Sequence, residues 1–313
     1  MKRIALVVFA TFTLAAQAEP VVFGLFGDFP YNAWERRELP KMIGEMDAEN
    51  LAFIVHDGDI KSGGSVCGEE VFKDVLGVFQ ASQHPLVYVL GDNEWTDCHR
   101  SSNGGYDPVE RLAKLREMFF TDDYALGKER LRLERQSRDA VFAAYRENVR
   151  WLAGGVLFVG MNVPGSNNNY FGTTRDRGPS AEYLDRAKAD RVWLASSFAL
   201  AKEKTLPGLV LVIQANPNLE AANVGHPDVG YKDFIDQLRA ETQAFAGEVV
   251  LVHGDTHHHQ INQPLLDPGN GEPVKNFTRV ETFGSPFMGW VRGTVDTAAP
   301  KLFRFEARPY QPD

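Results

Sequence analysis

The stretch HPLVYVLGDNEWTDC, residues 84–98, joins a short apolar run to a polar segment that begins at Gly91. The run, Leu86 to Leu90, has the length and the aliphatic and aromatic content of a strand that is buried on both faces. Gly91 and Asp92 are residue types that favour turns. The stretch therefore predicts a buried parallel strand whose carboxyl end opens into a polar loop.

The same arrangement occurs three more times, in PVVFGLFGD (20–28), LAFIVHDGD (51–59) and GEVVLVHGD (247–255). Helical patterns lie between and after these runs, at about 34–49, 69–81, 180–204 and 231–245. Alternating strands and helices favour an α/β fold with a parallel sheet, whose strands end at a common edge where ligands bind. One Gly-Asp pair after a strand is an ordinary turn, but four pairs at one edge predict a functional site.

The remaining segments indicate additions to this α/β core. Residues 107–148 are charged and are expected to form a helical insertion over the sheet, and VRWLAGGVLFVGMNV (149–163) reads as a hairpin or strand pair. The last fifty residues alternate in polarity and contain turn signals, so we expect antiparallel strands there. We expect one domain over residues 19–313.

Residues 1–18 have the pattern of a secretory signal peptide. Lys2 and Arg3 precede a short apolar run, and Ala16-Gln17-Ala18 is a small-x-small cleavage site. This predicts a periplasmic or secreted protein; the alternative is an apolar N-terminal strand. No other run is long and apolar enough to predict a membrane span.

The charge and cysteine content of the chain bear on two kinds of function, nucleic-acid binding and metal binding by thiolates. The chain has 42 acidic and 33 basic residues, a formal net charge of −9, and no basic run, which argues against nucleic-acid binding. The two cysteines, Cys67 and Cys98, are expected to form a disulfide in an exported protein. A thiolate metal site is the less favoured alternative, because neither cysteine has a second Cys or a His at close spacing.

The polar residues after the predicted strands are metal-ligand types. Asp28, Asp59 and Asn93 follow the first three runs, and VHGDTHHHQI (252–261) contains four of the chain's eight histidines. Asp, Asn and His are ligands for ions such as Mn, Fe and Zn. A carboxylate shared by two ions brings them to about 3.5–4 Å, where they clamp a phosphoryl group and activate water.

The order of these motifs resembles the calcineurin-like metallophosphoesterase family, and GDNEWTDC resembles an exported bacterial branch of it. The corresponding blocks here are GDFP, GDIKSGG, GDNEWTDC, QANP and HGDTHHH, which together span residues 27–259. The resemblance implies an αββα two-sheet sandwich, two divalent ions, and hydrolysis of a small phosphomonoester or phosphodiester. It does not indicate an oligomeric state.

The resemblance assigns ligands residue by residue. Asp28 and His257 match first-metal ligands, Asp59 matches the bridging carboxylate, and Asn93 resembles the second-metal Asn, with Asp92 as an alternative in register. Pro30, Asn216 and Asp255 stand where the family has histidines. The expected metal ligands are Asp28, Asp59, Asn93, Asn216, Asp255 and His257. This oxygen-rich set favours Mg or Mn over Zn, with Fe also open.

The family's proton-donating His is also absent. Glu94, Asp97, His99 or a metal-bound water would have to donate the proton instead. His253 is a further catalytic candidate if its side chain reaches the metals. His258 and His259 are expected mainly at the surface. Arg100 is expected to be an ordinary surface arginine, and the less favoured alternative is that it faces a phosphate because it follows the Asn93 block. The predicted function is a metal-dependent phosphoesterase; the alternative is a catalytically degenerate member that only binds.

Overall fold

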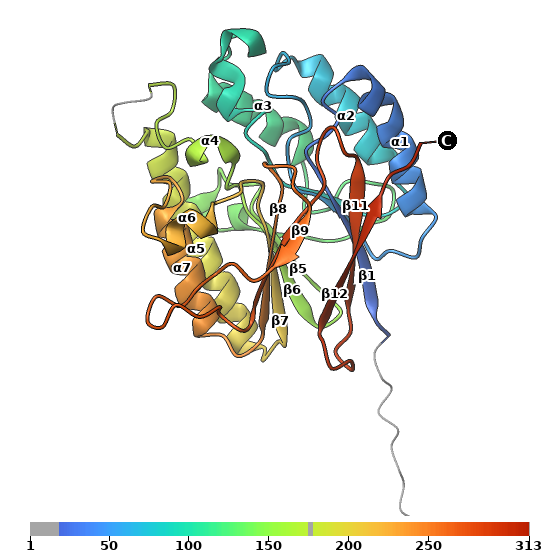
Figure 1. Ribbon diagram of the computed structural model, residues 1–313. Helices are drawn as coiled ribbons and strands as arrows, with labels where there is room; N and C mark the ends of the chain where they lie inside the picture. The colour runs from blue at the N-terminus through green and yellow to red at the C-terminus, as the bar shows by residue number, and fades with distance from the viewer. Residues whose placement is uncertain (1–18, 175–177, 313) are drawn as a thin grey trace, which may run out of the picture.

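The computed structural model describes residues 19–174 and 178–312, and within them the strands form two sheets (Figure 1). The predicted signal peptide, residues 1–18, lies outside the described residues. The first sheet has the order β12 (Phe303–Pro309), β11 (Gly289–Val295), β1 (Val21–Phe26), β2 (Ile54–His56), β3 (Leu86–Tyr88). The second has the order β4 (Glu134–Arg135), β5 (Val149–Ala153), β6 (Val156–Gly160), β7 (Gly208–Val212), β8 (Glu248–His253), β10 (Phe277–Glu281), β9 (Gln260–Asn262).

Helices cover the outer faces of both sheets (Figure 1). The first sheet packs against α1 (Ala33–Asp47), α2 (Glu69–Ala81) and α3 (Pro108–Phe119), and the second against α5 (Ala181–Glu203), α6 (Leu219–Asn223) and α7 (Lys232–Gln243). This arrangement confirms the predicted αββα sandwich.

Strand alternation explains why both faces of each sheet are apolar. In β7, Leu209 and Leu211 pack under the helices, while Val210 and Val212 face the other sheet. Successive side chains of a strand point to opposite faces, so a strand buried on both faces needs a continuous apolar run. The pairs β1–β2, β2–β3, β6–β7 and β7–β8 are parallel, as predicted.

The structure differs from the sequence prediction in two segments. Only Pro108–Phe119 of the expected insertion is α-helical; the rest consists of loops, the short strand β4 and the 3₁₀ turns η3 (Gln136–Arg138) and η4 (Ala140–Phe142). The C-terminal strands are not all antiparallel, because β10 runs parallel to β8 and antiparallel only to β9. A strand's polarity pattern does not show which neighbour it will pair with.

A disulfide joins Cys67 to Cys98, as predicted. It links the loop after β2 to η1 (Thr96–His99), the 3₁₀ turn after β3. Both sulfurs are buried, so the link fixes the polar loops of two neighbouring strands relative to each other. None of the helices within the described residues has the length and apolar character needed to cross a bilayer.

Candidate metal centre

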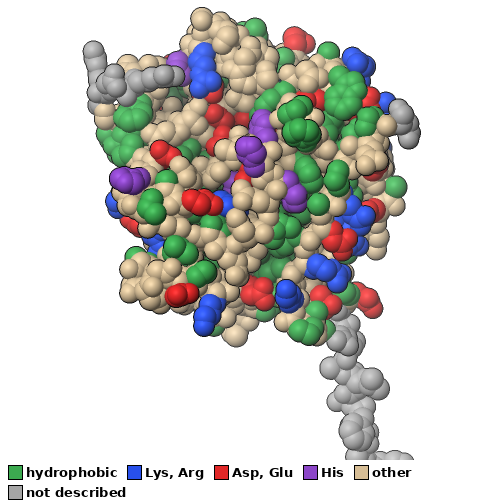
Figure 2. All heavy atoms as spheres, viewed as in Figure 1, with side chains coloured by type: hydrophobic (Ala, Val, Ile, Leu, Met, Phe, Trp, Pro, Cys, Tyr) green, Lys and Arg blue, Asp and Glu red, His purple; other side chains and the backbone are tan. Residues whose placement is uncertain are grey.

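Loops from both sheets meet at the carboxyl ends of their parallel strands. The backbone N–H of Asp255, after β8, donates to both carboxylate oxygens of Asp28, after β1, at 3.1 and 2.9 Å. Gln214, after β7, donates through Nε2 to Oδ1 of Asp92, after β3, at 3.2 Å. The expectation that strand ends share one edge is therefore met across two sheets. Figure 2 shows histidine side chains near the middle of one face, beside acidic ones.

Four of the predicted ligands have left-handed backbone conformations. The φ angles are 55° for Asp28, 60° for Asp59, 74° for Asp255 and 61° for His257. Such residues cost about 1–2 kcal/mol each, and the cost is smaller for Asp than for His. Strain of this kind gathers at functional sites, where the side chain must point in one direction.

Asp28, Asp59, His257 and Tyr31 form the first half of the cluster. The hydroxyl of Tyr31 donates to Oδ2 of Asp59 at 2.7 Å and lies 3.3 Å from Nε2 of His257. That Nε2 is 3.7 Å from Oδ1 of Asp28. Two atoms that bind one first-row ion at about 2.0–2.2 Å each lie about 3–4 Å apart, and the two separations at Nε2 of His257 are of this size.

The hydrogen bonds of His257 leave one ring nitrogen available as a ligand. Its Nδ1 is 2.6 Å from the carbonyl oxygen of Ser285. Because a carbonyl only accepts, Nδ1 carries a proton, and Nε2 is the ring nitrogen that faces Asp28 and Tyr31. A second hydrogen bond of this kind is typical of metal-ligating histidines.

Asp92, Asp255 and Gln214 form the second half. A Cβ atom added to Gly165 would lie 2.7 Å from Oδ1 of Asp92 and 2.7 Å from Oδ1 of Asp255, so these two oxygens approach the same point. Gln214 accepts from the N–H of Gly165 and donates to Asp92. Oxygen atoms of this kind are ligands for Mg and Mn.

Asn93 joins the cluster through Asp59. Its Nδ2 donates to Oδ2 of Asp59 at 2.6 Å and to the Tyr31 hydroxyl at 3.0 Å, and its backbone N–H donates to Oδ1 of Asp59. Its side-chain oxygen faces Gly63, where an added Cβ atom would lie 2.7 Å from it. The structure brings Asn93 together with Asp59, and it brings Asp92 to the same cluster.

The other predicted residues occupy different positions. The side chain of Asn216 bonds Thr256 and the N–H of Asn218 instead of the carboxylates. The Glu94 carboxylate is buried. It accepts hydrogen bonds from the N–H groups of Asp59 and Gly91 and from the Tyr88 hydroxyl, and it therefore stabilises the loops after β2 and β3 from the interior of the protein.

His253 is also fully buried, with Nδ1 at the carbonyl of Gly254 and Nε2 without a partner among the described residues. Burial lowers its pKa to about 4, which keeps the ring neutral. His258 and His259 lie at or near the surface of the loop. Both contact Glu281, and His259 also stacks on Phe283.

Sequence reasoning missed Tyr31, Gln214 and Ser166. Tyr31 stands three residues after Asp28, just beyond the Pro30 that replaces the expected histidine. Gln214 is a polar residue directly after an apolar strand, which was the available signal. Ser166 carries no such signal, because its place depends on a left-handed turn over residues 166–169.

Several carboxylates of the cluster are buried close to one another, and this raises their pKa values. Burial raises the pKa of Asp28 and of Asp59 well above the usual value, and neighbouring carboxylates raise both further. Burial and then Asp92 raise the pKa of Asp255 to about 8 and that of Asp97 to about 7. Buried carboxylates that repel one another are stabilised by a cation between them.

The donor chemistry of the cluster fits divalent ions. Within residues 19–174 and 178–312, no three His, Cys, Asp or Glu side chains are grouped closely enough to make a metal site by themselves. In the first half of the cluster, the additional donor is the phenol oxygen of Tyr31.

Comparison with known proteins identifies the fold. Of the protein-family models searched, none matches this sequence. The curated proteins give no match either. A dimetal phosphatase from Danio rerio superposes with a TM-score of 0.52 at 13% identity, over 92% of this chain and 96% of that one.

Two further solved structures agree. The protein PhoD superposes with a TM-score of 0.54 at 13% identity, over 93% of this chain and 69% of that one. A purple acid phosphatase from yellow lupin seeds gives 0.54 at 13% identity, over 94% of this chain and 52% of that one. The fold is the calcineurin-like phosphoesterase sandwich. At this identity the likeness establishes the fold, which is shared with phosphatases, and not the reaction.

The raised pKa of Asp255 predicts a pH dependence of stability without metal. In the folded protein this group holds a proton up to about pH 8, whereas the unfolded chain releases it near 4. The folded state binds more protons in this interval, so the free energy of unfolding must fall as pH rises from 5 to 8. We expect Asp255→Asn to flatten this fall in urea unfolding with chelator present. A fall of equal slope in the variant would contradict the assignment.

Proposed function

We propose that this chain is an exported, metal-dependent phosphoesterase that hydrolyses a small phosphate ester. The observation that carries the proposal is the convergence of carboxylates, a phenol and an imidazole at the strand ends. The fold, which is shared with phosphatases, supports the reaction class. The signal-like N-terminus supports export to the periplasm or beyond.

The residues divide into two ligand groups under this proposal. Asp28, Asp59, Tyr31 and His257 would hold one ion, Asp92, Asp255 and Asn93 would contribute to a second, and Asp59 would contribute to both. When bound, the ions supply positive charge to the transferring phosphoryl group and lower the pKa of a water molecule. The residues with left-handed backbone fix the directions of the ligand side chains. Glu94 and Trp95, which are buried, exclude water from the interior side of the cluster.

Asp97 is the best placed of the predicted proton donors. Oδ1 lies 2.7 Å from the hydroxyl of Ser166, and that hydroxyl is also 2.8 Å from Oδ2 of Asp92. Because a hydroxyl carries one proton, both contacts are hydrogen bonds only if one carboxyl is protonated. A pKa of about 7 makes Asp97 that carboxyl at and below neutral pH.

The metal requirement is tested with Asp59→Asn. Purified wild-type protein is assayed on phenyl phosphate and bis(p-nitrophenyl) phosphate with Mn, Mg, Fe or Zn, and bound metal is measured per chain. We expect metal retention and hydrolysis in the wild type, and a loss of at least about 100-fold in kcat/KM in the variant, since even outer-shell changes cost 10–100-fold. Asp236→Asn, which alters an exposed ion pair on α7, is the matched control.

Two results distinguish the proposal from its alternative. A folded wild type that retains no metal and hydrolyses neither ester with any of the four ions contradicts the enzyme and favours a degenerate binding protein. Metal retention without hydrolysis points to the same alternative.

The role of Asp97 predicts a dependence on the leaving group. Asn keeps the size of the side chain but holds no transferable proton, so Asp97→Asn should slow an alkyl phosphate about 100-fold or more and an aryl phosphate much less. An acid acts only while protonated, so kcat of the wild type should fall as pH rises through about 7. Equal losses on both substrates would instead indicate a structural role.

A further inference from the structure

Arg100 lies at the rim of the carboxylate cluster. Its Nη1 is 2.7 Å from Oδ2 of Asp97, and its Nη2 donates to the hydroxyl of Ser166 at 3.4 Å. A Cβ atom added to Gly63 would lie 3.8 Å from Nη1 and 2.7 Å from the side-chain oxygen of Asn93. The guanidinium therefore lies between the loop after β2, at Gly63, and the turn that begins at Ser166.

The charge of Arg100 is accessible, whereas that of the other cation near the cluster is not. Lys61 is 2% exposed, and its ammonium donates to the carbonyl oxygens of Ser62 and Asn93. The Arg100 side chain is 39% exposed. A guanidinium has five N–H donors, and its contacts among the described residues involve only the two Nη atoms. Donors thus remain on the side that faces solvent.

The support beneath Arg100 is rigid. Its backbone N–H donates to the carbonyl of Asp97, and its own carbonyl accepts from Asn103 and Gly105. The preceding residues form η1, which the disulfide at Cys98 anchors. The arginine is therefore held by its backbone as well as by its contact with the Asp97 carboxyl, which reduces the entropy lost when it binds a ligand.

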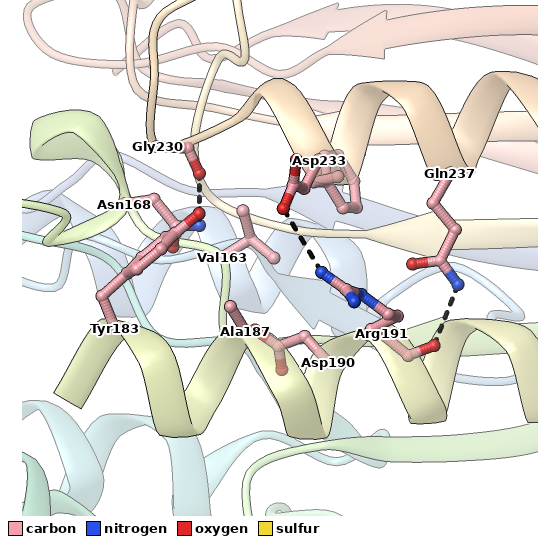
Figure 3. Close-up of a pocket in the computed structure, with 10 residues that line it drawn as sticks. Val163, Asn168, Tyr183, Ala187, Asp190, Arg191, Gly230, Asp233 and Gln237 are labelled. Carbon is pink, nitrogen blue, oxygen red and sulfur yellow. Dashed lines mark hydrogen bonds and ion pairs between the residues drawn. The ribbon is translucent and has the colours of Figure 1, made fainter. Parts of the chain in front are cut away.

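The contact with Ser166 is also fixed from behind. Ser166 begins the turn of four left-handed residues, with φ between 50° and 56°. The buried Arg186 donates to the side-chain and backbone oxygens of Asn168, and Asn168 donates to the carbonyl of Gly230 (Figure 3). These hydrogen bonds hold a strained turn that points Ser166 at Asp92, Asp97 and Arg100. Strained backbone of this kind is typical of functional sites.

We propose that Arg100 binds the phosphate group of the substrate, with Ser166 orienting the guanidinium, and that it favours phosphomonoesters. This inference rests on the proposed function. A planar guanidinium binds two phosphate oxygens at once, and it gains more from the dianion of a monoester than from the single charge of a diester. Arg100 touches substrate and takes no part in proton transfer.

The test compares Arg100→Gln, Arg100→Lys and the wild type, each loaded with Mn. Inorganic phosphate is the probe, with its dissociation constant measured by calorimetry and its inhibition constant measured against phenyl phosphate. We expect Arg100→Gln to weaken phosphate binding and to lower kcat/KM for phenyl phosphate about 10- to 100-fold, because a charged hydrogen bond is lost. The loss on bis(p-nitrophenyl) phosphate should be smaller, and Arg100→Lys should recover part of the binding.

The matched control is Arg191→Gln. Arg191 is an exposed arginine that pairs with Asp233 in the pocket between α5 and α7, away from the cluster (Figure 3). Its loss should leave phosphate binding unchanged.

The outcomes separate this inference from the proposed function. If Arg100→Gln hydrolyses esters and binds phosphate as the wild type does, the inference is overturned and the function stands. The same conclusion follows if Arg100→Gln has a lower Tm but unchanged phosphate binding. Phosphate binding that depends on Arg100 without hydrolysis of any ester supports the inference and overturns the function. A folded wild type that neither binds phosphate nor hydrolyses an ester overturns both.

Discussion

The site depends on the repulsion among carboxylates that the two sheets bring to one edge. The backbone N–H of Asp255 holds both oxygens of Asp28, so the loop after β8 is tied to the loop after β1. Desolvation and mutual repulsion raise the pKa of these groups, and close cations are few: Lys61 is engaged by carbonyls and Arg100 lies at the rim. Folding therefore creates a place where positive charge is stabilised, and left-handed backbone at four ligand positions is the conformational cost.

This view explains how a site can survive the loss of family histidines. Pro30 cannot ligate, yet the next residue, Tyr31, places its hydroxyl between Asp59 and His257. Gln214, two residues before the Asn216 that seemed the replacement, carries the side chain that reaches Asp92. At Tyr31 an oxygen donor thus takes a position where the resemblance led us to expect nitrogen, which shifts the expected preference towards harder ions. Gln214 instead presents its amide N–H to Asp92.

The sequence was sufficient for the fold and for part of the site. Continuous apolar runs ending in Gly-Asp predicted parallel strands with a shared edge, and Asp28, Asp59, Asn93 and His257 lie there. It was not sufficient for Asn216, whose amide turns to Thr256, or for Glu94 and His253, which are buried behind the loops. Alternation along a strand predicts side-chain direction, but a loop after a strand has no fixed period, and left-handed residues redirect it. The position of Ser166 depends on such a turn and on Arg186 from a distant helix, so no local pattern could reveal it.

The most direct test of the central claim is to locate metal ions in crystals of the protein grown with Mn²⁺, using anomalous scattering at the manganese edge. The account predicts a peak within bonding distance of Asp28, Asp59, Tyr31 and His257, and a second near Asp92 and Asp255. Data of adequate quality that show no peak at either position, with the carboxylates still hydrogen-bonded to one another, would contradict it.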